Sequence, residues 1–172
     1  KEQYDQTRIF ESKKDRVEEL NTSKRKIISK IEEELPKFVN IPGIRISKLF
    51  RELGFRYLEL QNFEKAIEYL ERIDEANGED FIGLGDAYAE TDQIQKAIDS
   101  YNRAGNNLKL KSVAAYKRAW AYMRLNNFAR ALVEFDLALK PNPFAKSQLM
   151  QEAYQDRIRP YLNTFQKQSF DR

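Results

Sequence analysis

Carboxylates are the side chains of this sequence that could most readily do chemistry. Glu32, Glu33 and Glu34 follow one another, and Asp92 lies in a later polar segment. General acid–base catalysis needs two such groups held in one pocket with shifted pKa values, and the spacing brings no specific pair together. Runs of this kind on an amphipathic helix are typical of a solvated face. The sequence therefore predicts that the chain is not an enzyme.

The sequence also contains no pattern that indicates a metal site or a phosphate-binding loop. Histidine and cysteine are absent, which removes the usual zinc ligands, the cysteine nucleophile and the side chain that titrates near neutral pH. The Gly-Leu-Gly at 83–85 lacks the Lys-Ser/Thr ending of a phosphate loop. We expect no metal site and no cofactor, and we interpret this segment as a packing feature.

The charge balance argues against nucleic acid and membrane. Lys and Arg number 30 against 27 for Asp and Glu, a net charge of +3. Basic residues at 24–26 and 109–111 could contact phosphates, but acids follow the first run at 32–34, and no basic stripe with interleaved aromatics is present. Apolar stretches are far shorter than the roughly 20 residues that cross a bilayer. We expect a soluble chain without direct membrane insertion, and, since it begins at Lys1, a piece of a longer protein.

The elements that would position any site come from an internal repeat. Segments 50–73, 81–104 and 115–138 share one register, offset by 31 and then 34 residues. Within each segment, apolar residues recur at spacings of three and four, which predicts two short amphipathic helices separated by a polar break. One such hairpin cannot bury its apolar face alone, so neighbours must stack. The matched columns are Gly54, Gly85 and Ala119; Tyr57, Tyr88 and Tyr122; Phe63, Ile94 and Phe128; Ala66, Ala97 and Ala131; and Leu70, Tyr101 and Phe135.

Over residues 47–143 these columns make the chain resemble the tetratricopeptide repeat family, whose unit is about 34 residues with Leu-Gly, Tyr, Ala, Phe, Ala and Pro at set places. Leu53-Gly54, Leu84-Gly85 and the closing Pro143 match, whereas Arg118-Ala119 departs from Leu-Gly. The resemblance implies an all-α fold, an α-solenoid of helical hairpins. We assign its repeats to 47–77, 78–111 and 112–143, within a domain at 44–143.

Residues 1–43 form a charged, helical N-terminal extension. Its apolar residues follow a coiled-coil-like seam, and the polar segment 21–23 could end one helix and cap another. Two interpretations stay open, a self-associating coiled coil and helices that pack back on the repeats. Pro42 and Gly43 interrupt any helix and predict the boundary. The seam residues are Phe10, Val17, Leu20, Ile27, Ile31 and Leu35.

Residues 144–172 are predicted to cap the third repeat. A helix after Pro143 would place Leu149, Ala153 and Ile158 on one covered side. Pro160 can start a final helix that runs through Phe165, because proline fits a first turn.

In the tetratricopeptide repeat family the first helix of each repeat lines a concave face that receives a peptide. The resemblance therefore implies a partner-binding groove in this chain. Residue by residue, its slots hold Lys48, Arg51, Phe55, Leu58 and Glu59, then Glu79, Ile82, Asp86, Ala89 and Glu90, then Val113, Tyr116, Trp120, Met123 and Arg124.

Aromatic residues in these slots suggest an anchor site. Trp120 could join Tyr116, Met123 and Phe55 in gripping a partner. The alternative is that Trp120 simply packs against the capping helix.

Some family members hold the C-terminal carboxylate of a chaperone with a set of Lys, Asn and Arg residues. Here Phe55 and Asp86 stand where that set has asparagine, and Val113 stands where it has lysine. Arg51 and Lys117 alone do not make this clamp, so a co-chaperone role is disfavoured.

The sequence thus predicts a non-enzymatic scaffold that binds a partner protein or peptide in its groove. The candidate partner-binding residues are Arg51, Phe55, Leu58, Ile82, Asp86, Tyr116, Lys117, Trp120, Met123 and Arg124. The alternative is a structural spacer that forms homo-oligomers through residues 1–40. Residues 116–135 look like repeats of large bacterial envelope assemblies, which favours the periplasm over the cytoplasm.

Overall fold

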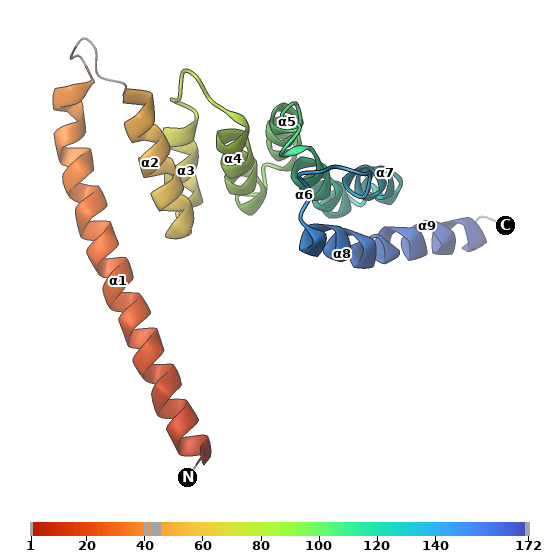
Figure 1. Cartoon of the computed structure of the whole chain (residues 1–172), viewed down its shortest axis with the longest axis horizontal. Helices are drawn as coiled ribbons and strands as arrows, with labels where there is room; N and C mark the ends of the chain where they lie inside the picture. The colour runs from red at the N-terminus through yellow and green to blue at the C-terminus, as the bar shows by residue number, and fades with distance from the viewer. Residues whose placement is uncertain (1, 40, 42–45, 171–172) are drawn as a thin grey trace. The chain divides into compact units, whose positions relative to one another are not determined.

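The computed structural model describes residues 2–39, 41 and 46–170, and their side chains within 13–39, 41 and 46–164. All regular elements of the described residues are α-helices, as predicted (Figure 1). Two compact units are present, Lys1–Leu49 and Phe50–Arg172. The predicted roles of Phe10 and of the Pro42-Gly43 boundary lie outside the described residues, as does the side chain of Phe165.

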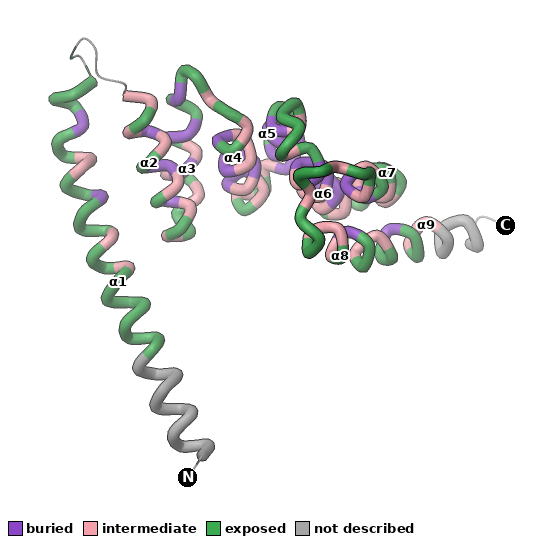
Figure 2. Tube along the Cα trace, viewed as in Figure 1, coloured by how far each residue is buried: buried purple, intermediate pink, exposed green. Residues whose placement is uncertain are grey.

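The N-terminal extension is one continuous helix, α1 (Glu2–Phe38). The predicted break at 21–23 is wrong, because the Thr22 hydroxyl donates to the Glu18 carbonyl at 2.9 Å and is satisfied inside the helix. Ile28 and Leu35 are buried. Most other positions between 13 and 38 are exposed (Figure 2).

The second unit is built from helical hairpins. Each pair is joined by a turn in which one residue has positive φ: Gln61 at 57°, Asp92 at 60° and Asn126 at 54°. Two of these turns then cap the following helix, since Asn62 accepts from the Lys65 amide and Asn127 from the Arg130 amide. The predicted polar breaks are thus confirmed. The pairs are α2 (Ile46–Glu59) with α3 (Phe63–Leu70), α4 (Gly78–Glu90) with α5 (Ile94–Ala104), and α6 (Lys111–Arg124) with α7 (Phe128–Ala138).

Small residues allow the two helices of a hairpin to approach closely. A Cβ at Gly54 would lie 2.6 Å from Leu70, and one at Gly85 would lie 2.4 Å from the Tyr101 ring. Either distance is below any normal contact, so these positions require glycine unless the neighbouring side chain moves. In the third hairpin Ala119 and Phe135 are both fully buried in one apolar cluster.

Two further helices, α8 (Ser147–Asp156) and α9 (Ile158–Phe170), pack against α7. Ala153 of α8 and Pro160 of α9 are buried. The prediction that Ile158 lies on a covered side with Ala153 is wrong, because Ile158 is 54% exposed. Pro160 does lie in the first turn of α9.

We expect Phe135→Ala to lower the free energy of unfolding by about 3–5 kcal/mol, because it empties a fully buried ring site. Val133→Ala is the matched control on the same helix, since Val133 is 65% exposed, and should change stability by about 0.5 kcal/mol or less. Urea unfolding followed by circular dichroism measures both. Equal losses in the two variants would contradict the packing described here.

Candidate protein-interaction groove

The first helices of the three hairpins line a groove of about 530 Å³. We call it the α4–α6 groove, because most of its walls come from these two helices. Leu58 of α2 lines it, with Gln61 and Phe63 of the α2–α3 turn and α3, and Tyr101 of α5 reaches it from the second hairpin. The remaining lining residues are Asp86, Ala89, Glu90, Tyr116, Lys117, Trp120, Ala121 and Arg124.

A hydrogen-bonded network around Asp86 joins three helices in this groove. Lys117 Nζ lies 2.7 Å from Asp86 Oδ1 and 2.9 Å from Oδ2, and the Tyr101 hydroxyl donates to Oδ1 at 2.8 Å. The Lys117 and Asp86 side chains stay 31% and 37% exposed. The acid and the base neutralise each other, so this part of the groove presents polar groups without net charge.

Tyr101 remains a donor in this network over a wide pH range. Burial, followed by the negative charge of Asp86, raises the pKa of Tyr101 far above its ordinary value of 10.0. The same ring lies against Gly85. The Tyr101 side chain therefore has two roles: its ring packs against α4 at Gly85, and its hydroxyl donates to Asp86 in the groove.

Arg124 closes one end of the groove. Its guanidinium donates to the Ala89 carbonyl and, at 3.0 Å, to Asp92 Oδ1. The side chain is 42% exposed, so it links α6 to the turn after α4 while one edge faces solvent.

Aromatic residues form the wall toward the third hairpin. Tyr116 and Trp120 both meet Phe135 edge-on, with ring centroids 5.9 and 6.1 Å apart. The Tyr116 hydroxyl donates to Asp156 Oδ2 at 2.8 Å, and the Arg159 guanidinium lies 5.6 Å from the Trp120 ring. Trp120 thus packs against the capping helices and lines the groove at once.

Six of the ten predicted residues line this groove, and four lie elsewhere. Arg51 holds Asp80, Phe55 lies against Gly83, Met123 packs on the Phe135 cluster and Ile82 is half-buried. The predicted meeting of Phe55 with the other aromatics is not among the ring contacts of the described residues. The six are Leu58, Asp86, Tyr116, Lys117, Trp120 and Arg124.

Arg51 has a structural partner that the sequence interpretation missed. Its guanidinium donates to both oxygens of Asp80, at 2.7 and 2.8 Å, and Asp80 is fully buried. Asp80 also accepts from the Asn77 amide, while Asn77 accepts from the Asp80 amide. The spacing of Asn77 and Asp80 is that of a capping box, which was the available sequence signal.

The structure also adds Gln61, Phe63, Tyr101 and Ala121 to the predicted lining. Gln61 comes from a turn, and Phe63 and Tyr101 come from second helices, which the family's groove slots do not include. Ala121 belongs to a first helix but is buried in a cluster with Ile94 and Ile98. Within the described residues no three acidic side chains converge as metal ligands, and no helix combines the length and apolarity needed to cross a membrane.

We expect Tyr101→Phe to lower the free energy of unfolding by about 1 kcal/mol at neutral pH, because the hydroxyl that donates to Asp86 is lost. A raised folded-state pKa contributes stability that is complete below the unfolded value of 10.0 and is lost as the pH rises above it. Tyr101→Phe has no phenol to titrate and does not lose this stability. The difference in free energy of unfolding between wild type and Tyr101→Phe should therefore become smaller between about pH 9 and about pH 11. Urea unfolding measures both effects, with the exposed Tyr154→Phe as control; a constant deficit would contradict the prediction.

Comparisons with known proteins agree with this architecture. A family model described as tetratricopeptide repeat matches residues 52–80. The crystal structure of MamA superposes with a TM-score of 0.59 at 21% identity, covering 83% of this chain and 88% of that one. No curated protein matches the sequence. The family model covers part of the first hairpin and the connection after it, and the likeness to MamA at 21% identity shows the fold, a stack of helical hairpins.

Proposed function

We propose that the chain is a non-enzymatic scaffold that binds a partner protein or peptide in the α4–α6 groove. The supporting observation is that six residues predicted for partner binding, drawn from three helices, surround one open volume of about 530 Å³. Arg51, Phe55, Ile82 and Met123 act indirectly in this proposal, by holding the helices that carry the six.

The lining indicates what kind of segment the groove takes. Leu58, Ala89 and Trp120 offer apolar contact, while the paired Asp86 and Lys117 offer a donor and acceptors without net charge. A partner with an apolar or aromatic side chain flanked by polar groups fits this surface. A C-terminal carboxylate fits it poorly, because Lys117 is already neutralised by Asp86.

We further infer, from the resemblance of residues 116–135 to envelope repeats alone, that the partner belongs to a bacterial envelope assembly.

Filling the groove should abolish partner binding without unfolding the chain. Ala89 is a small, half-buried lining residue of α4, so Ala89→Arg adds a long side chain and removes no side-chain hydrogen bond. The immobilised wild-type chain should retain partner proteins from an extract of its native source. The amount of these proteins retained by Ala89→Arg should be lower by about tenfold or more. Quantitative mass spectrometry measures the retention.

Gln95→Arg is the matched control, since Gln95 is exposed on α5 and lies outside the groove lining. Both variants should keep the wild-type helical circular dichroism. If a folded Ala89→Arg chain retained the same amount of partner protein, the proposal that the partner binds in the α4–α6 groove would be wrong.

A second role, self-association through α1, is favoured by a separate observation. Val17, Leu20 and Ile27 are 58%, 57% and 60% exposed, and Phe38 is 39% exposed. Their spacings of three, seven and eleven residues keep them within one stripe of the helix, close to a coiled-coil seam. Ile27 and Phe38 also line an apolar hollow of about 340 Å³ with Ile31 and Leu49. A second copy of α1 would cover this stripe.

Charges placed on the stripe should dissociate such an assembly. We expect Leu20→Lys with Ile27→Lys to reduce the mass measured by light scattering from an oligomer to a monomer, because lysines in a seam lose apolar burial and repel each other. Thr22→Lys with Ser29→Lys adds the same charge with the same seven-residue spacing at exposed positions on another face of the helix and should leave the mass unchanged. If light scattering gave a monomer mass for the wild-type chain, self-association through α1 would be excluded.

A further inference from the structure

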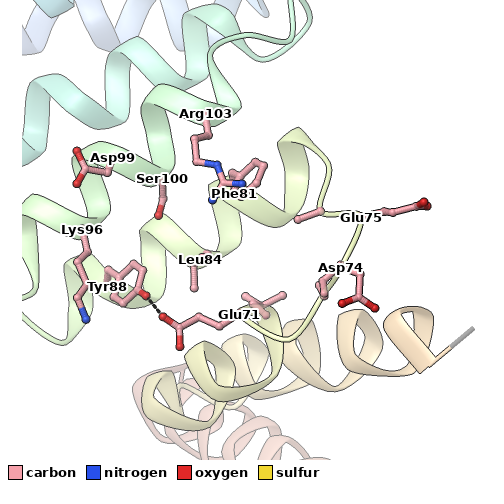
Figure 3. A pocket seen from close by; sticks show the side chains of 13 residues that line it. Glu71, Asp74, Glu75, Phe81, Leu84, Tyr88, Lys96, Asp99, Ser100 and Arg103 are labelled. Carbon is pink, nitrogen blue, oxygen red and sulfur yellow. Dashed lines mark hydrogen bonds between the residues drawn. The ribbon is translucent and has the colours of Figure 1, made fainter. Parts of the chain in front are cut away.

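A second cleft, of about 430 Å³, lies where the first hairpin connects to the second (Figure 3). Its walls are the end of α3 with the connection that follows, and one face of α4 and α5. We call it the α3–α5 cleft. It shares no lining residue with the α4–α6 groove, so partner binding in the groove leaves it unused.

A short connection forms one wall of this cleft. The repeat step from Gly54 to Gly85 is 31 residues, against 34 from Gly85 to Ala119. The shortened stretch carries Asp74 and Glu75, and both line the cleft with Glu71. The deletion thus sets an acidic wall opposite α5.

Ser100 provides an observation independent of these acids. Its side chain is only 5% exposed, and it lines the cleft from α5. Figure 3 shows its hydroxyl on the cleft side of the helix. Among the hydrogen bonds of the described residues none involves this hydroxyl. The oxygen is not among the fully buried polar atoms that lack a partner, so it is open to the cleft. An unpartnered hydroxyl on a largely buried side chain that faces a cleft is a place for a ligand's polar group.

The charges of the cleft favour a cationic guest. Its two bases already lie over rings: the Arg103 guanidinium 3.9 Å from the Phe81 centroid, and the Lys96 ammonium 5.1 Å from that of Tyr88. Glu71 accepts a hydrogen bond from the Tyr88 hydroxyl, and within the described residues neither Glu71 nor Glu75 has a cation within ion-pair distance. Glu71 and Glu75 therefore retain acceptor capacity, while the two basic side chains already lie against aromatic rings.

The guest must be an extended cation and not a bare metal ion. No three acidic side chains of the described residues converge closely enough to hold a metal. The open acceptors come from separate elements, Glu71 at the end of α3 and Ser100 on α5. A guanidinium has five N–H donors that point in several directions and so suits acceptors on separate elements, whereas an ammonium is a single point charge.

We propose that the α3–α5 cleft binds an arginine side chain presented by a protein partner. Several lining residues, among them Glu71, Lys96 and Arg103, are solvent-exposed, so the cleft does not enclose a whole small molecule as ligand pockets do. It suits a side chain that enters from a docked surface.

Tyr88 positions the acid that receives this arginine. Burial, then the hydrogen bond to Glu71, raises the pKa of Tyr88 well above its ordinary value, so the hydroxyl keeps its proton and remains the donor. Glu71 is thereby held toward the cleft with its second oxygen free of that bond.

The probe is N-acetyl-L-arginine amide, titrated into the chain of residues 1–172 and followed by amide chemical shifts in nuclear magnetic resonance. We expect shifts centred on residues 71–76 and 96–103, with a Kd of about 1–10 mM. Glu71→Gln keeps an acceptor for Tyr88 but removes the charge, and should weaken binding about tenfold. Ser100→Ala loses no internal hydrogen bond and should weaken binding about threefold to tenfold.

Glu64→Gln removes the same charge from an exposed position of α3 outside the cleft and should leave the Kd within about twofold. Ala89→Arg, which fills the groove, should also leave it unchanged, which separates this site from the proposed function. The neutral analogue N-acetyl-L-citrulline amide should bind at least about tenfold more weakly.

Three results would overturn the proposal. They are equal binding of the citrulline probe, stronger binding of N-acetyl-L-glutamate amide, and shifts that do not centre on the cleft. Tighter binding of free L-arginine than of N-acetyl-L-arginine amide would also contradict the proposal, because it would indicate that the ligand is a free amino acid and not a protein side chain.

Discussion

The close approach of the two helices in each hairpin is the contact on which this protein depends. Gly54 meets Leu70 and Gly85 meets Tyr101 at distances that leave no room for a Cβ. A larger residue at these positions would displace the Leu70 or Tyr101 side chain or part the helices, and either change loses dispersion contacts and apolar burial. In the third hairpin alanine fills the slot, and Phe135 supplies the bulk across from it. Tyr101 also connects this packing to the groove, because its hydroxyl donates a hydrogen bond to Asp86.

Charged side chains, and not only apolar ones, join successive hairpins. Arg51 to the buried Asp80 links the first to the second, and Lys117 to Asp86 links the second to the third. Such pairs contribute little net stability, because desolvation offsets most of the attraction, but a displaced partner would leave a charge unpaired. We infer that they fix the register in which neighbouring hairpins stack.

Arg118 follows the same logic. It stands where the repeat usually has leucine, yet it is only 6% exposed. Its guanidinium donates to Glu134 Oε2 at 3.0 and 2.8 Å and to the Tyr101 carbonyl at 3.2 Å. The departure from the family pattern is therefore accommodated by a satisfied ion pair in place of apolar contact.

The sequence by itself determined the hairpins, because the alternation of small and large residues and the polar breaks are local signals that repeat three times. Through the resemblance to the tetratricopeptide repeat family it also led to part of the groove lining, since the family's groove slots include Asp86 and Trp120. It did not show that Arg51 would be held by Asp80, that α1 would continue through Thr22, or that Ile158 would face solvent. Only the tertiary structure decided these, and brought Glu71, Tyr88 and Ser100 to one cleft. The physical reason is that periodicity reports which face of a helix is covered, whereas the partner that covers it comes from a residue far away in the chain.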